Sequence, residues 1–161
     1  MNTPANPPAN SPGNSPANSP VDASMHQPLP FPPRVSYDTE PFWKYCAAHE
    51  LRLQKCSACG AVRWPVALVC PQCLGRDFTW SLCGGQGRIY SFVVFHRAFH
   101  PRLEGLVPYV VASVQLEEGP RFTSNIVNCA PSSLECEQPV RLIWKDGPEG
   151  ISLPVFEPVP K

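Results

Sequence analysis

Hydrophobic and polar residues alternate along most of the second half of the chain. Between residues 88 and 156, five short segments rich in β-branched and aromatic residues are separated by turn residues. These segments are residues 88–96, 109–116, 121–127, 140–144 and 152–156. Glu117–Pro120 supplies the turn between the second and the third. Five short strands without a long helix favour a closed barrel, and we expect a five-stranded barrel of the OB type.

One helical pattern precedes these strands, at residues 39–49. A single face of this helix would carry Phe42, Tyr45, Cys46 and His49, which follow the i, i+3, i+4, i+7 spacing. Asp38 or Thr39 can cap its N-terminus. We expect the face to pack on its own domain, with a partner's surface as the second choice. Three short extended segments follow, at residues 51–55, 61–65 and 77–80.

The first part of the chain has a different composition. Ten of the 22 prolines precede Arg34, Asp22 is the only charged residue in that stretch, and residues 11–20 nearly repeat every four positions. Such a segment has little to bury, so it is expected to be disordered or polyproline-like. Its apolar part, Leu29–Pro33, is the best candidate for contact with a partner.

Charge and targeting signals narrow the function. The chain has 161 residues, with 13 basic and 13 acidic side chains and no net charge, and its Lys and Arg residues are scattered. Nucleic-acid binding is therefore disfavoured, because each neutralised phosphate needs a basic residue. No stretch approaches the ~20 apolar residues of a membrane span, and no secretory signal is visible. We expect a cytoplasmic protein that does not bind membranes.

Four of the eight cysteines form two C-x-x-C units. Cys56 and Cys59 are separated by ten residues from Cys70 and Cys73. Two such units predict a tetrahedral four-thiolate site for one structural zinc ion, as in zinc ribbons. Gly60 after the first unit and Gly75 after the second are expected to supply the permissive backbone that each C-x-x-C turn, or knuckle, needs. A thioredoxin-like redox pair would need one unit in a βαβ context, which is missing here.

These patterns together predict a mainly β chain in three parts. Residues 1–36 form a disordered Pro/Asn/Ser-rich tail, residues 37–83 a helix plus a zinc ribbon, and residues 84–161 the OB-fold barrel. The remaining cysteines share no spacing, so we expect small buried hydrophobic residues rather than nucleophiles. They are Cys46, Cys83, Cys129 and Cys136.

A small polar cluster follows the first barrel strand. It consists of His96, Arg97, His100 and Arg102. The cluster can be an ordinary exposed loop, since loops collect such residues. Alternatively, it can contact the phosphates of coenzyme A or an acidic surface of a partner, because Arg suits phosphate recognition.

The order of the motifs resembles the zinc-ribbon/OB-fold family known as domain of unknown function 35. The resemblance covers about residues 37–158. It rests on Pro41-Phe42-Trp43, Cys56-Ser57-Ala58-Cys59-Gly60, Trp64-Pro65, Cys70-Pro71-Gln72-Cys73, Trp80, Gly85–Phe92, Pro108–Ala112 and Gly119. All four ribbon cysteines of the family are present, and the Pro/Asn-rich tail is a departure from the compact pattern.

The resemblance implies a non-catalytic companion of acyl-CoA enzymes. Family members associate with thiolases, with steroid side-chain aldolases of thiolase fold and with hydratase subunits, some in the degradation of aromatic compounds or steroids. The barrel is thought to contact the partner and to help accommodate the CoA ester. We therefore expect an accessory subunit of a thiolase or thiolase-fold aldolase, required by that enzyme and sharing its acyl-CoA substrate.

Two alternatives remain. A nucleic-acid-binding ribbon/OB module is the first, in which Tyr90, Phe92 and Phe95 would stack on bases. Aromatic residues on barrel strands are more often core, however. An enzyme acting alone through a cysteine is the second, but the sequence contains no visible cysteine–base pair.

Overall fold

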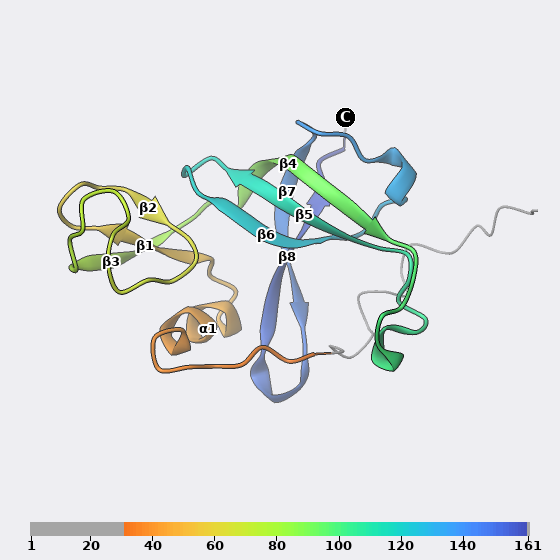
Figure 1. The fold of residues 1–161 in the computed structure, drawn as a ribbon, viewed down its shortest axis with the longest axis horizontal. Coiled ribbons are helices and arrows are strands. Elements are labelled where there is room, and N and C mark those ends of the chain that lie inside the picture. Colours follow the sequence, from red (N-terminus) through yellow and green to blue (C-terminus); the bar gives the residue numbers. More distant parts are fainter. Residues whose placement is uncertain (1–30, 161) are drawn as a thin grey trace, which may run out of the picture.

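The computed structural model describes residues 31–160 of the chain. A three-stranded sheet lies at one end of the molecule and a closed barrel at the other, with one helix beside them (Figure 1). Most of the predicted tail lies outside the described residues. No helix among residues 31–160 has the length and hydropathy of a membrane span.

Helix α1 (Glu40–Ala47) is shorter than the predicted segment. Pro41 lies in its first turn, and Thr39 is the N-cap without donating or accepting a side-chain cap hydrogen bond. Phe42 and Cys46 are buried, as the periodicity predicts. His49 was expected on the same face, but the helix has ended by then and His49 takes a positive φ of 57°.

The three extended segments before residue 84 form one antiparallel sheet in the order β2-β1-β3. Its strands are β1 (Arg52–Cys56), β2 (Val62–Arg63) and β3 (Phe78–Leu82). Helix α1 packs on this sheet through aromatic contacts: the ring centroids of Phe42 and Trp64 are 4.5 Å apart, and those of Tyr45 and Trp80 are 5.7 Å apart. The helix therefore packs on its own chain, as expected.

The five predicted strands of the second half close into a barrel in the order β4-β5-β6-β8-β7. Its strands are β4 (Gln86–Phe95), β5 (Tyr109–Leu116), β6 (Arg121–Ile126), β7 (Pro139–Asp146) and β8 (Ser152–Pro158). Short 3-10 helices lie in the connections, at Pro101–Leu103, Pro131–Ser133 and Pro148–Gly150. All strand pairs are antiparallel except β6–β8, which is parallel and has a single register pair, Ile126 with Phe156.

One hydrophobic core runs through the helix, the sheet and the barrel. Strand β5 alternates strictly, with Val110, Ala112, Val114 and Leu116 buried. Phe122 of the barrel touches the aromatic residues of the other half, since its ring centroid is 4.6 Å from that of Trp64 and 6.4 Å from that of Phe42. The sheet and the barrel therefore share core contacts.

The aromatic residues of β4 are less buried than a core role requires. Phe92 packs against the core, but Tyr90 is 47% exposed and was wrongly expected inside. The pairing of β4 with β5 shifts between Ile89 and Ser91, so Tyr90 is the extra residue of a β-bulge. The guanidinium of Arg121 lies over its ring, 3.4 Å from the centroid.

Candidate functional site: a four-cysteine metal centre

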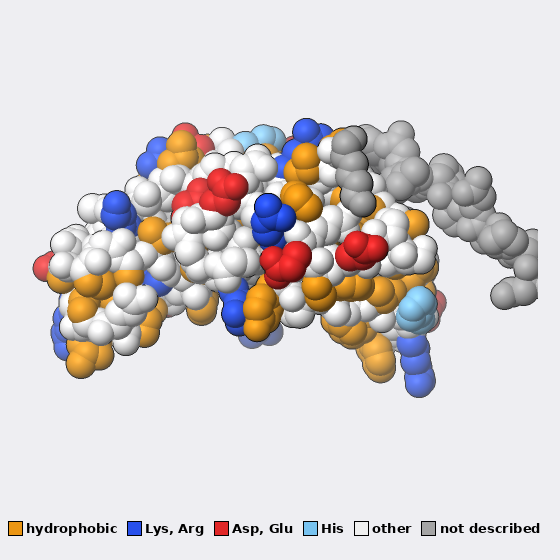
Figure 2. Space-filling view, turned by 90° about the horizontal axis from the view of Figure 1, so that it is seen from above, with side chains coloured by type: hydrophobic (Ala, Val, Ile, Leu, Met, Phe, Trp, Pro, Cys, Tyr) orange, Lys and Arg blue, Asp and Glu red, His pale blue; other side chains and the backbone are white. Residues whose placement is uncertain are grey.

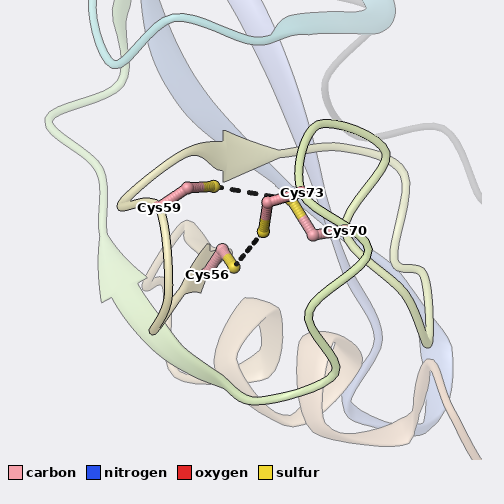
Figure 3. Close-up of side chains that lie close together, drawn as sticks. All are labelled: Cys56, Cys59, Cys70 and Cys73. Atoms are coloured by element: carbon pink, nitrogen blue, oxygen red, sulfur yellow. Dashed lines mark hydrogen bonds between the residues drawn. The ribbon is translucent and has the colours of Figure 1, made fainter.

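The two C-x-x-C units meet at the end of the small sheet. Cys56 is the last residue of β1, Cys59 follows in the turn to β2, and Cys70 and Cys73 lie in the loop between β2 and β3. Figure 3 shows the four side chains pointing toward one common centre. The structure therefore brings together all four predicted metal ligands.

The distances between the sulfur atoms fit a tetrahedral metal site. All four Sγ atoms lie within 4.8 Å of one another, with 3.5 Å between Cys56 and Cys73 and 3.7 Å between Cys59 and Cys70. Zinc–sulfur bonds of about 2.3 Å in a tetrahedron place sulfur atoms about 3.8 Å apart. All four cysteines are free of disulfides, so each sulfur is available as a ligand.

The two units have the same backbone structure. The N–H of Gly60 donates to the carbonyl of Cys56, and the N–H of Leu74 donates to that of Cys70, both at 2.9 Å. Gly60 has a φ of +74°, as expected for a turn glycine. In the second unit, however, Leu74 occupies the equivalent left-handed position, with a φ of +61°. The prediction that Gly75 serves this purpose is wrong.

Gly75 instead lies in a narrow space between the two knuckles. A Cβ atom at this position would lie 3.3 Å from the Sγ of Cys73, 3.4 Å from the Cβ of Ala58 and 3.5 Å from the Sγ of Cys56. A side chain here would therefore be slightly tight against the Sγ of Cys73 and would make ordinary contact with the first knuckle. Little room is left for a side chain larger than that of alanine at this position.

Backbone N–H groups favour the thiolate form of the first cysteine in each pair. Those of Cys59 and Ala58 lower the pKa of the Cys56 thiol, and those of Cys73 and Gln72 lower the pKa of the Cys70 thiol to about 6. At Cys73, a hydrogen bond from the Gly75 backbone lowers the pKa, but the neighbouring sulfurs raise it to about 12. A cation is therefore needed for all four sulfurs to ionise together.

This donor set fits one zinc ion in a structural role. Four thiolates complete the tetrahedral coordination of zinc and leave no position for water or a substrate. The site can therefore hold the ribbon together, but it offers no activated water for catalysis. Its chemistry is that of a folding element.

The other cysteines divide into buried and exposed ones. Cys46 and Cys83 are buried as expected, and desolvation raises the pKa of their thiols to about 12 and about 11. Cys129 is half-buried. Cys136 is exposed, so the expectation of burial is wrong there, because the Leu134–Gln138 turn directs only Leu134 inward.

His96, Arg97, His100 and Arg102 all lie, exposed, on the segment between β4 and β5. The Nδ1 of His100 accepts a hydrogen bond from the Arg102 N–H at 3.1 Å, and its ring is 5.0 Å from that of Phe31. The guanidinium of Arg97 lies 5.9 Å from the ring centroid of Phe99. The four residues of the cluster thus lie on one loop, next to the exposed rings of Phe31 and Phe99.

A cavity of about 380 Å³ lies next to this segment, between β5, β6 and β8. Its lining is mostly apolar and includes Leu103, Leu106, Tyr109, Val111, Ile126 and Lys145. Burial lowers the pKa of Lys145. The cavity lies where β6 and β8 share a single register pair, which no local sequence pattern reveals.

One histidine lies next to a carboxylate and a serine, as in the triads of serine hydrolases. The Nε2 of His49 is 2.8 Å from the Oδ1 of Asp146, and the ring of His49 stacks on that of Trp144. Ser152 donates to the same oxygen of Asp146 at 2.7 Å, and not to His49. The histidine therefore does not activate the serine, and this group fastens the end of α1 to the β7–β8 hairpin.

Two family descriptions match the chain in succession. Residues 43–79 match "ChsH2, rubredoxin-like zinc ribbon domain", and residues 80–145 match "ChsH2, C-terminal OB-fold domain". The division between them falls in β3, close to the point where the small sheet leads into the barrel.

Similar proteins and a solved structure indicate the same family. A "DUF35 domain-containing scaffold protein" of Methanothermobacter thermautotrophicus is 36% identical over 118 residues, which are 70% of this chain and 88% of that protein. A "Probable enoyl-CoA hydratase alpha subunit" of Thermomonospora curvata is 37% identical over 126 residues. These are 78% of this chain but only 39% of the hydratase subunit. The structure titled "Ltp2-ChsH2(DUF35) aldolase" superposes with a TM-score of 0.72 at 36% identity, covering 79% of this chain and 98% of that one.

Proposed function

Because the chain belongs to the ChsH2 zinc-ribbon and OB-fold family, or DUF35, we propose that it is a non-catalytic accessory subunit of an acyl-CoA enzyme. The partner would be a thiolase or a thiolase-fold aldolase that cleaves or forms a C–C bond in a CoA thioester, in the cytoplasm. The observation that carries this proposal is the superposition on the DUF35 chain of an aldolase complex, which extends over 98% of that chain.

The chemistry of the described residues supports a non-catalytic role. The four-thiolate site has no open coordination position. The hydroxyl of Ser152 donates a hydrogen bond to the Asp146 carboxylate rather than to His49. Cys46 and Cys83 are buried thiols with raised pKa values, which makes them poor nucleophiles. The bond-making groups would therefore belong to the partner.

Exposed apolar side chains offer surfaces for such a partner. Leu68 and Leu74 of the ribbon are 74% and 75% exposed, and Phe99, near the cavity, is 72% exposed. Figure 2 shows apolar side chains gathered at the ribbon end and again at the opposite end of the molecule. Large exposed apolar residues in groups are typical of interaction sites.

We assign the second of these surfaces to the partner or to the CoA it holds. The segment with His96, Arg97, His100 and Arg102 would supply positive charge beside the apolar cavity. Arginine side chains suit the phosphates of CoA or carboxylates of a protein surface. An apolar cavity next to cations also matches an acyl-CoA molecule, which joins an apolar acyl chain to a part that carries negatively charged phosphates.

Capture of the full chain from its native host tests the proposal. Affinity purification of the tagged protein, followed by mass spectrometry, is expected to recover a stoichiometric thiolase-like protein. Recovery of nucleic acid in its place, or of the chain alone, would overturn the proposal. Arg121 already covers one face of the Tyr90 ring, which leaves less of it for stacking on a base.

A charge reversal tests the contact surface. Arg97→Glu is expected to weaken binding of the captured partner and to reduce the salt dependence of that binding. The reason is that a charged residue at the edge of an interface mainly changes the association rate and its dependence on salt. Arg121→Glu, on the barrel strand β6, is the matched control. Equal affinities for the wild type and Arg97→Glu would remove the segment from the interface.

A further inference from the structure

Two buried polar residues of the ribbon are not explained by the metal ligands themselves. Gln54 on β1 is 2% exposed, and Arg63 on β2 is 5% exposed. They are register partners in the sheet. A guanidinium keeps its positive charge when it is buried, and removing it from water costs free energy. A buried arginine is therefore expected to make specific contacts that offset this cost.

The two side chains bind each other and one loop residue. The Oε1 of Gln54 accepts hydrogen bonds from the Nε of Arg63 at 2.8 Å and from the N–H of Ala67 at 3.0 Å. The Nη2 of Arg63 donates to the carbonyl of Ala67 at 3.0 Å. Both backbone groups of Ala67 are therefore held by this pair, which we call the Gln54–Arg63 brace.

The brace connects the two halves of the metal site. Gln54 lies two residues before Cys56, on the strand that carries the first knuckle, whereas Ala67 lies three residues before Cys70 in the second. Residues 64–69 link β2 to the second knuckle as a loop without helix or strand. Fixing Ala67 against β1 therefore sets where Cys70 and Cys73 lie relative to Cys56 and Cys59.

Charge adds to this geometry. Zinc with four thiolates carries a net charge of −2, and Arg63 is a buried cation in the same small sheet. Its guanidinium lies 5.1 Å from the ring centroid of Phe78, the register partner of Cys56, and its buried Nη1 makes no hydrogen bond within residues 31–160. A buried cation in the same small sheet offsets part of the negative charge of such a centre.

We propose that Gln54 and Arg63 are positioning residues for the zinc ion, which hold the second knuckle in its ligating position. Loss of the brace then releases Cys70 and Cys73 from the metal before Cys56 and Cys59. Partners of metal ligands commonly change metal affinity by about 10–100-fold when replaced. The proposal concerns the ribbon alone and does not depend on the identity of the partner enzyme.

Pulsed alkylation of the zinc-loaded full chain, read by mass spectrometry for each cysteine, tests this proposal. Arg63→Met removes the charge and the donors but retains most of the stem, and Gln54→Leu removes the shared acceptor. Arg52→Met is the matched control, since Arg52 lies on β1, the strand of Gln54, and pairs with Glu50 rather than with the loop. Cobalt substitution reports the number of thiolates on the metal through its absorption bands.

In both brace variants, Cys70 and Cys73 are expected to react about 10–100-fold faster than in the wild type, with Cys56 and Cys59 changing less. Arg52→Met should react like the wild type. Arg63→Lys keeps the positive charge but lacks the two guanidinium nitrogens that bind Gln54 and Ala67. Its cysteine reaction rates should therefore lie between those of the wild type and of Arg63→Met. Wild-type rates in both brace variants, or equal acceleration of all four cysteines, would overturn the proposal.

Discussion

At the scale of single residues, the two knuckles use different amino acids at the same backbone position. Gly60 takes the left-handed conformation without strain, whereas Leu74 takes it with a Cβ atom and with 75% of its side chain exposed. A left-handed L-residue costs about 1–2 kcal/mol. Leu74 is therefore unfavourable in the isolated chain, both in its backbone and in its solvent exposure.

Leu74→Gly is expected to stabilise the ribbon by about 0.5–1 kcal/mol, because relief of the strain exceeds the added entropy of an unfolded glycine. A chelator titration that follows zinc release should show a higher midpoint than for the wild type. Gly60→Ala introduces the same strain at the first knuckle and should shift the midpoint the other way. A lower midpoint for Leu74→Gly would show that the leucine supports the fold.

At the scale of elements, the start of β4 depends on the absence of a side chain. A Cβ at Gly87 would lie 2.6 Å from the carbonyl oxygen of Gln115 and 2.8 Å from the Cγ1 of Val114, both on β5. The neighbouring Gly84 has only an ordinary contact, 3.6 Å to the Oε1 of Glu118. The two strands can approach this closely only with glycine at residue 87.

Gly87→Ala is thus expected to destabilise the barrel by about 1–3 kcal/mol, as overpacking does. Gly84→Ala serves as the control and should stay within about 0.5 kcal/mol of the wild type. Urea denaturation of both variants measures the difference. Equal midpoints for the two would contradict the close approach of β4 and β5.

The closure of the barrel between β6 and β8 relies on side chains as well as on the backbone. The Oε2 of Glu157 accepts from the Nδ2 of Asn128 at 2.6 Å, and its Oε1 lies 2.6 Å from the Nη2 of Arg141. The hydrogen bond from Asn128 and then that from Arg141 lower the pKa of the Glu157 carboxyl. Glu157 thereby joins β8 to β7 and to the end of β6.

A lowered carboxyl pKa stabilises the folded state above the ordinary pKa and loses that contribution as the pH falls through the folded value. Glu157→Gln is expected to lower the Tm by the same amount at all values above about pH 5, with the gap closing below about pH 4. Melting curves between pH 7 and pH 3 measure this, with Glu135→Gln as the exposed control. A gap that does not change with pH would contradict it.

At the scale of the whole molecule, the shared core links the metal site to the barrel. Phe42 and Trp64 from the helix and the ribbon contact Phe122 of the barrel. Unfolding of the ribbon would expose these rings. The barrel would then lose part of its core as well.

Removal of zinc by a chelator, or Cys59→Ser, is therefore expected to unfold the ribbon, to lower the Tm of the entire chain and to abolish binding to the partner. Near-ultraviolet circular dichroism reports the loss of packing around Trp64. Cys136→Ser, at an exposed cysteine outside the site, is the control. A zinc-free variant that kept its near-ultraviolet spectrum and still bound the partner would refute the structural role of the metal.

The sequence predicts what local patterns determine. Alternation placed the strands within about two residues of their observed bounds, and the spacing of Cys56, Cys59, Cys70 and Cys73 predicted the four cysteines that the structure brings together. Features that depend on contacts between distant parts of the chain could not be predicted from the sequence. The Gln54–Arg63 brace is absent from the motif because side chains of two paired strands and the backbone of a loop create it, and the bulge that exposes Tyr90 arises from the register of β4 and β5.

Reconstitution of the partner's activity tests the central claim most directly. The enzyme captured with this chain would be purified alone, and its turnover of a CoA thioester measured while the zinc-loaded chain is added. We predict that activity rises and saturates at a fixed stoichiometry, whereas the chain alone is inactive. Full activity of the enzyme without the chain, or turnover by the chain alone, would contradict the account.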